Sequence, residues 1–234
     1  LLTHNETSTG VTNDLEALTT VAREFDKLIL VDAISSLGSI NLPVDAWGCD
    51  FVATGSQKGW MTPPGLAMVS VSPKGWQAYE KAKMPRYYFD VGKAKKYLEK
   101  NQTPWTPAVS IVFGLAVGLD NLAKEGLPNL VARHKKVAQR ARDHVKALGL
   151  KLFPADESYA SNTVTAIVGP EGVDVKKLLQ ILREEHKVVL AGGQAKLDGK
   201  IFRIGHLGWV SEKDMDEVAN ALKAALPKVG FKGK

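Results

Sequence analysis

Hydrophobic residues follow two different patterns along this chain, and the pattern changes near position 108. Before that point, short runs rich in aliphatic residues stand between polar and glycine-rich segments. Such runs have the length and composition of buried strands. We therefore predict strands at Leu28–Asp32, Phe51–Thr54 and Leu66–Val71. A helix is expected from a cap at Asn13 or Asp14 to about Phe25, and a second, short one over Lys74–Lys83.

After position 108 the apolar residues recur at helical spacing over a long span. Two helices are predicted, Ala108–Glu125 and Leu130–Leu148, because Gly126-Leu127-Pro128 between them is a stop and restart signal. The rest alternates strand and helix over Thr163–Val168, Val175–His186, Ile201–Ile204 and Glu212–Leu226. The segment Arg86–Trp105 is expected to be loop with one basic helical turn or more.

These elements predict an α/β fold with a mostly parallel sheet, followed by a small α+β domain. We place part of the large domain at residues 1–125 and the small C-terminal domain at 126–234. The apolar segment Ile111–Leu119 is expected to be a core helix. The chain opens with Leu1-Leu2-Thr3, which looks like the middle of a strand, so we expect an N-terminally truncated fragment of a longer protein.

Composition narrows the classes of function. The chain has 234 residues and a formal net charge of +6, with the basic residues widely spread. The densest group, Lys93, Lys95, Lys96 and Lys100, is typical of a solvated helix face and a poor match to a nucleic-acid site. No apolar run reaches membrane-spanning length, and the histidines lack metal-ligand spacing. We expect a cytoplasmic protein without a metal site.

Cys49 is the only cysteine in the sequence. It allows no disulfide within the chain and no cysteine-ligated iron–sulfur or zinc site. A reducing compartment agrees with this usage.

Two polar residues stand where predicted parallel strands end. Asp32 closes the first strand, and Lys58 follows the second within Gly55-Ser56-Gln57-Lys58-Gly59. Ligands of open α/β sheets bind beyond the carboxyl ends of strands. A lysine and a carboxylate are also what pyridoxal phosphate chemistry requires, the first for a Schiff base and the second to keep the pyridine nitrogen protonated. Taken singly, each residue is more simply a turn aspartate or a surface lysine.

Several motifs, in order over nearly the whole chain, resemble the class V aminotransferases, a family of fold-type I pyridoxal phosphate enzymes. The similarity is greatest to the alanine–glyoxylate and serine–pyruvate aminotransferases. The matching segments are His4-Asn5-Glu6-Thr7-Ser8-Thr9-Gly10, Leu30-Val31-Asp32-Ala33, Gly55-Ser56-Gln57-Lys58-Gly59, Pro63-Pro64-Gly65 and Phe202-Arg203-Ile204-Gly205. One such motif alone is weak, whereas the ordered set is specific.

The resemblance implies roles around the cofactor ring. Lys58 matches the Schiff-base lysine, and Asp32 matches the aspartate that pairs with the pyridinium nitrogen. Thr7 matches a hydroxyl residue that hydrogen-bonds the phenolic oxygen of the ring. From the residues alone, Thr7 is as readily a turn-stabilising side chain. His4 and Glu6 are better regarded as structural neighbours.

The resemblance also implies contacts to the cofactor phosphate and to the substrate. Gln57 matches a phosphate contact, and Thr106, with Thr103 as the alternative, matches a residue that reaches the phosphate in the neighbouring subunit. The active site would then be shared within a homodimer. Arg203 matches the arginine that binds the substrate carboxylate, and Gly192-Gly193 is expected to be a mobile loop near the entrance.

The function implied is a ping-pong transfer of an amino group from a small amino acid, alanine or serine, to glyoxylate or pyruvate, through a Schiff base on Lys58. Gly59 departs from the Lys-Ala-Leu type of sequence found in relatives, which leaves the donor open. Two alternatives remain. One is a non-catalytic subunit or interaction module, of the kind labelled a soluble hydrogenase subunit. The other is a different reaction on the same cofactor, such as a lyase reaction.

Overall fold

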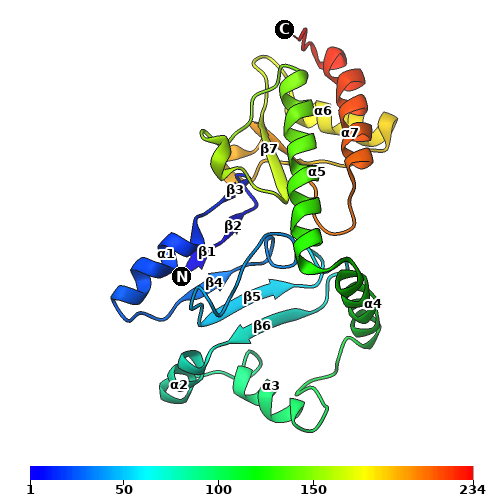
Figure 1. The fold of residues 1–234 in the computed structure, drawn as a ribbon. Coiled ribbons are helices and arrows are strands. Elements are labelled where there is room, and N and C mark those ends of the chain that lie inside the picture. The colour runs from blue at the N-terminus through cyan, green and yellow to red at the C-terminus, as the bar shows by residue number, and fades with distance from the viewer. Residues whose placement is uncertain (234) are drawn as a thin grey trace.

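The computed structural model describes residues 1–233, and its first layer is a four-stranded sheet. The strands β1 (Leu2–Thr3), β4 (Leu30–Asp32), β5 (Phe51–Gly55) and β6 (Ala67–Val71) lie side by side in the order β1-β4-β5-β6 (Figure 1). The first three are parallel, whereas β6 pairs with β5 in the antiparallel sense at the edge. The mostly parallel sheet is thus confirmed.

Short helices accompany this sheet. They are α1 (Leu15–Glu24), α2 (Pro73–Lys81) and α3 (Val91–Leu98). Helix α1 begins where predicted, because the Asp14 carboxylate accepts a hydrogen bond from the Ala17 amide and satisfies one free donor of the first turn. Its Leu15 side chain packs with Ile29, Val31 and Val52 in a first hydrophobic cluster. Helix α3 lies in the segment for which we expected a basic helical turn or more, and it has eight residues.

A second, antiparallel sheet forms the other part of the molecule. It contains β7 (Val164–Val168), β9 (Ile201–Gly205) and β8 (Ala191–Gly192), in the order β7-β9-β8. Helices α5 (Leu127–Ala147), α6 (Val175–His186) and α7 (Glu212–Ala225) pack against one face of it. Figure 1 shows these helices beside β7. The second hydrophobic cluster lies here, and its largest fully buried side chain is Phe202. Three short 3-10 turns complete this part, at Glu157–Tyr159, Ala195–Leu197 and Leu226–Val229.

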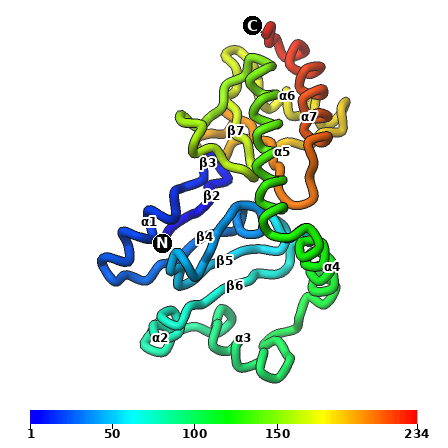
Figure 2. The backbone as a smooth tube through the Cα atoms, viewed as in Figure 1, coloured from blue at the N-terminus to red at the C-terminus, as the bar shows by residue number. Residues whose placement is uncertain are grey.

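A hairpin from the start of the chain reaches across to this second part. It consists of β2 (Asn5–Glu6) and β3 (Val11–Thr12), and the tube in Figure 2 shows it next to β7. The Ser161 amide donates to the carbonyl of Gly10 at 2.9 Å. A side chain at position 10 would bring a Cβ within 3.0 Å of Ala166, and the φ of Gly10 is +69°, so glycine is required at this crossing.

Helix α5 begins earlier than the sequence predicts. The structure starts it at Leu127, where the pattern indicated Leu130. The prediction treated Pro128 as a barrier, but the proline lies in the first turn, where its missing N–H is not needed. Gly126, with a φ of +80°, separates α5 from α4 (Val109–Glu125).

The expectation of a core helix at Ile111–Leu119 is wrong for the described residues. Within α4 only Gly118 and Leu122 are buried, whereas Phe113 is 71% exposed and Val117 is 62% exposed. The helix packs one narrow face against the segment after β5, where Gly118 lies over the Trp60 carbonyl, and its other apolar side chains face outward. The helix itself was predicted correctly. Helical periodicity does not show, however, whether another element covers the apolar face of that helix.

No helix within residues 1–233 combines the length and the apolar character needed to span a membrane. The first hydrophobic cluster consists of residues that precede α4 in the chain, and the second consists of residues from α5 onward. The division of the chain at residues 125 and 126 stays a prediction.

Candidate functional site

Three loops from neighbouring parallel strands meet at one edge of the large sheet. The register pairs Thr3 with Asp32 and Asp32 with Ala53, so β1 and β4 end level, and β5 continues in the same direction to Gly55. The residues that follow those ends therefore emerge together. Among them are Thr7 after β1, Ser35 after β4 and Lys58 after β5.

These loops form one wall of a pocket whose other wall is the small sheet. Thr7, Ser35 and Lys58 line it from the first side. Thr163, Gln194 and Arg203 are among the residues that line it from the second. The cavity has a volume of about 260 Å³. Three residues that the sequence singled out from distant positions, Thr7, Lys58 and Arg203, are thus brought into one cavity.

Arg203 is buried in β9, with only 6% of its surface exposed. Its Nε donates to the Gly192 carbonyl at 2.9 Å and its Nη1 to the Thr7 carbonyl at 2.8 Å. Burial lowers the pKa of the guanidinium, and the nearby Glu6 carboxylate partly opposes this. In the described part of the chain, Arg203 forms no salt bridge. Its charge therefore lies at the pocket wall without a direct carboxylate partner, which suits an anionic ligand.

The glycine pair near the entrance differs from expectation. Gly192 belongs to β8 and pairs with Phe202, and the Gly193 amide donates to the Ile201 carbonyl at 3.0 Å. The segment is thus hydrogen-bonded to the sheet and does not form a free loop, and its mobility stays a prediction. The Gly192 carbonyl orients Arg203. The sequence did not indicate this role, because it belongs to the backbone and not to a side chain.

The Thr7 hydroxyl is held from the β4 side. Its Oγ1 donates to the Ser35 Oγ at 2.8 Å. Ser35 also receives a hydrogen bond from the Asn5 side-chain amide, which in turn reaches Thr163 Oγ1 at 3.1 Å. A polar network thus joins the hairpin, the loop after β4 and the small sheet beneath the pocket.

Lys58 is half-buried at the pocket wall, in the turn after β5. Gly59, which follows it, lies against the turn after β4. An added Cβ would approach the Leu37 carbonyl and Ser39 Oγ to 2.7 Å, closer than real Cβ contacts. The glycine that departs from the Lys-Ala-Leu type therefore has a packing reason. It lets the Lys58 turn approach the backbone of its neighbour.

Other predicted site residues lie outside the set that lines this pocket. Asp32 ends β4, and its Oδ1 accepts a hydrogen bond from the Ile34 amide at 3.0 Å, as a turn aspartate does. Gln57 is exposed beside Lys58, and Thr106 is exposed in the segment before α4. The alternative, Thr103, donates to the Trp105 carbonyl at 2.6 Å. Their roles toward a cofactor stay predictions.

Sequence reasoning missed Ser35, Thr163 and Gln194. Ser35 was not among the predicted site residues. Its place three residues after Asp32, in the loop that follows a strand, was the available signal. No local signal marks Thr163 or Gln194, because only the packing of the two sheets brings them to the pocket.

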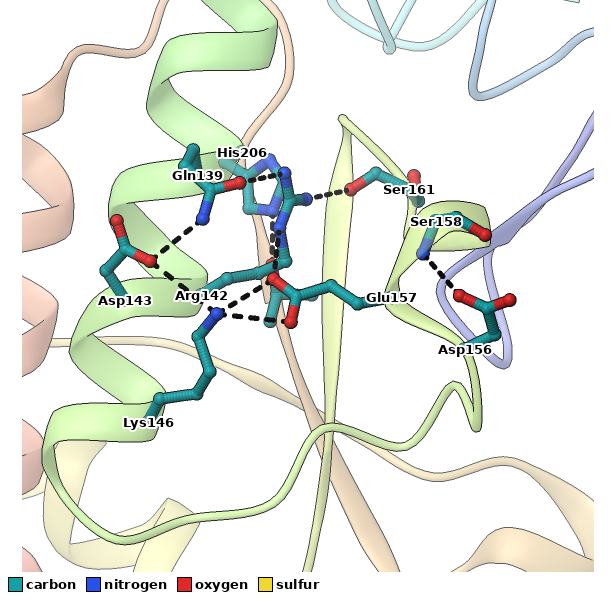
Figure 3. Close-up of polar contacts among 10 residues, drawn as sticks. Gln139, Arg142, Asp143, Lys146, Asp156, Glu157, Ser158, Ser161 and His206 are labelled. Carbon is teal, nitrogen blue, oxygen red and sulfur yellow. Dashed lines mark hydrogen bonds and ion pairs between the residues drawn. The ribbon is translucent and has the colours of Figure 1, made fainter.

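A buried arginine supports the pocket wall from behind. Arg142, on α5, donates from Nη1 to the Ser161 carbonyl at 3.1 Å, and its Nη2 contacts Gln139 (Figure 3). Its Nε lies 3.6 Å from the Glu157 carboxylate. Burial lowers the pKa of Arg142, while Glu157 opposes that effect. Ser161 Oγ lies 3.1 Å from Thr163 Oγ1, so this cluster is linked to the polar network beneath the pocket.

The family model of Aminotransferase class-V matches residues 1–204 of this chain. The chain belongs to the class V aminotransferases. These are pyridoxal-phosphate-dependent enzymes, so the similarity inferred from the motifs is confirmed together with the fold class.

Curated relatives resemble the chain over nearly its whole length. A protein of Synechococcus sp. (strain PCC 6716) named soluble hydrogenase, small subunit, is 47% identical, over 99% of this chain and 60% of its own. The serine–glyoxylate aminotransferase of Arabidopsis thaliana is 36% identical, over 98% of this chain and 58% of its own. The chain spans about 60% of the length of such curated relatives.

A solved aminotransferase structure superposes closely. The pyridoxamine–pyruvate aminotransferase from Mesorhizobium loti matches with a TM-score of 0.94 and 33% sequence identity, covering 99% of this chain and 60% of that one. The arrangement of the two sheets around the pocket is therefore that of the family.

Proposed function

We propose that this chain carries the Schiff-base lysine and the carboxylate-binding arginine of an aminotransferase that uses pyridoxal 5'-phosphate. The amino donor would be a small amino acid, alanine or serine, and the acceptor glyoxylate or pyruvate, in a ping-pong reaction. One observation carries the proposal. A lysine and a buried arginine that has no carboxylate partner within residues 1–233 line the same small pocket.

The residues present fit this cofactor and its substrates. The pocket offers an amine, hydroxyl groups and a guanidinium, a donor set suited to an anionic ligand with a reactive carbonyl. When bound, pyridoxal phosphate supplies an electron sink for the substrate α-carbon. Lys58 would hold the cofactor and then move the proton at that carbon. Arg203 would bind the substrate carboxylate through its planar fork.

The remaining predicted roles belong to the same proposal. Asp32 would pair with the pyridine nitrogen, Thr7 with the phenolic oxygen and Gln57 with the phosphate. Thr106, or Thr103, would reach the phosphate in the neighbouring subunit of a homodimer. The protein would be cytoplasmic and would act without a membrane or nucleic acid.

The complete protein, borohydride-reduced and digested for peptide mass mapping, tests the proposal. A phosphopyridoxyl group is expected on Lys58, and Lys58→Arg should abolish both the adduct and transamination. Lys124→Arg, at an exposed position on α4, is the matched control and should retain both. An unmodified Lys58 in the complete protein would refute the proposal.

A non-catalytic role is the second candidate, and it is supported by the name of the Synechococcus relative. The single cysteine of this chain argues against iron–sulfur or nickel–iron chemistry within it. The same reduction experiment separates the two functions, since an interaction module would be colourless and would acquire no adduct.

A further inference from the structure

The Ser35 hydroxyl, at the base of the pocket, has a hydrogen-bond partner for its proton and for both lone pairs. Its side chain lines the cavity beside Lys58 and Arg203, yet the residue is only 4% exposed. The Ser35 Oγ lies 2.8 Å from Thr7 Oγ1, 2.8 Å from the Asn5 side-chain nitrogen and 3.1 Å from the Asn5 backbone oxygen. A hydroxyl has one proton and two lone pairs, so these contacts occupy all three.

The direction of each bond follows from counting protons. The backbone oxygen of Asn5 can only accept, so the single Ser35 proton must go to it. Ser35 therefore has no proton left for Thr7, and Thr7 must donate its own proton to Ser35. This result is the same whichever way the Asn5 side-chain amide is turned. The Thr7 oxygen then has only lone pairs to offer to the pocket.

We propose that Ser35 is a positioning residue that makes the Thr7 hydroxyl a hydrogen-bond acceptor toward the pocket. The pocket would thereby select a ligand group that carries an N–H or O–H at that place. This inference rests on the proposed function, since the ligand in question is the pyridoxal phosphate held by Lys58. Without Ser35, the Thr7 proton is free to turn toward the ligand.

The consequence is a change in the protonation equilibrium of the bound cofactor. An acceptor stabilises the protonated form of the group it contacts, and a donor stabilises the deprotonated form. Ser35 therefore favours the protonated form through Thr7. Ser35→Ala should favour the deprotonated form, and it should act only when Thr7 carries its hydroxyl.

The experiment is a pH titration of the visible absorbance of the complete protein loaded with pyridoxal phosphate. Ser35→Ala should lower the apparent pKa of the bound cofactor by about 0.5 to 1 pH unit, the size expected for one hydrogen bond that changes direction. Ser35→Cys, which leaves a weaker acceptor in place, should lower it less. In a Thr7→Val background, Ser35→Ala should leave the pKa unchanged.

Ser36→Ala is the matched control. Ser36 is the next residue and is fully buried, and its Oγ has no hydrogen-bond partner among residues 1–233. It should leave the titration unchanged. An unchanged pKa in Ser35→Ala and Ser35→Cys, or an equal shift in the Thr7→Val background, would overturn the inference while the Lys58 adduct persists. A parent protein that takes up no pyridoxal phosphate would overturn the proposed function and the inference with it.

Discussion

The Nη1 of Arg203 lies 2.8 Å from the carbonyl oxygen of Thr7, although 196 positions separate the two residues. The guanidinium makes a second contact, from Nε to the Gly192 carbonyl at 2.9 Å. The arginine is thus fixed by backbone groups, which leaves its positive charge available to a ligand. This geometry joins the loop after β1 to the small sheet at the pocket.

Arg203→Lys keeps the positive charge, but it should still strongly impair substrate binding. A lysine ammonium cannot span both carbonyl oxygens and present a planar fork to a carboxylate. We expect kcat/KM for the amino donor to fall by about 100-fold or more, equivalent to about 3 kcal/mol of lost charge-assisted hydrogen bonding. Steady-state kinetics would measure this.

Arg183→Lys is the control for that substitution. Arg183 is exposed on α6, outside the pocket, and the change keeps its charge. Its kinetics should match the parent protein. Equal kinetics for Arg203→Lys would contradict a carboxylate-binding role for Arg203.

Gly59→Ala should destabilise the protein and disturb the Lys58 turn. The new Cβ would lie 2.7 Å from the Leu37 carbonyl, so the two turns must separate. Overpacking of this kind costs about 1–3 kcal/mol. Chemical denaturation would measure the loss of unfolding free energy, and borohydride trapping would report a lower yield of the Lys58 adduct.

Gly114→Ala is the matched glycine substitution. Its Cβ would lie 3.4 Å from the nearest atom, Thr62 Cγ2, and the position is in the middle of α4. Because alanine has the higher helix propensity, we expect unchanged or slightly raised stability. If both variants lost the same stability, close approach at Gly59 would not be the reason.

Arg142→Ala should destabilise the small sheet and its link to the pocket. The substitution removes the donor of the buried Ser161 carbonyl and the partner of Glu157. Because Glu157 is 42% exposed and partly solvated, we expect about 1–3 kcal/mol, below the cost of breaking a fully buried pair. Denaturant titration would measure it.

Arg140→Ala on the same helix is the comparison. Arg140 pairs with Asp216 at the surface, where water solvates both partners. Its effect should be much smaller than that of Arg142→Ala. A reversed order would mean that the Arg142 cluster in Figure 3 does not support the fold.

Stability should fall on mild acidification because of buried histidines. Burial lowers the pKa of His206 from 6.5 to about 3 and that of His4 from 6.5 to about 4. At a pH between 6.5 and the folded-state pKa of each histidine, that histidine is protonated in the unfolded chain and neutral in the folded chain. The stability from each histidine is therefore complete above pH 6.5 and is lost as the pH falls toward the folded-state pKa.

His206→Gln should reduce this pH dependence. The slope of unfolding free energy against pH should decrease by about 1 kcal/mol per pH unit between about pH 6 and about pH 5. The slope is the quantity to compare, because the substitution also removes or alters the hydrogen bond to Thr165. That change shifts the unfolding free energy at every pH. Urea titrations at both pH values would measure it, and an unaltered slope would contradict a neutral, buried His206.

Much of this protein could be predicted from local sequence. The cap at Asp14, the aliphatic runs of β4 and β5 and the helical period of α5 all determine elements through interactions within a few residues. The ordered motifs around Lys58, Asp32 and Arg203 were sufficient for the family, because they preserve chemistry as well as spacing.

Only the tertiary structure decided which residues share the pocket and what each one contacts. Thr7, Ser35 and Lys58 meet because three parallel strands have their carboxyl ends at the same edge of the sheet, and Arg203 joins them because a second sheet packs against that edge. The sequence pattern also did not predict that the apolar face of α4 is exposed. Nor did it predict that the Thr7 hydroxyl donates to Ser35. Such contacts form between residues that are far apart in the chain. Sequence patterns mainly reflect interactions between residues that are close in the chain.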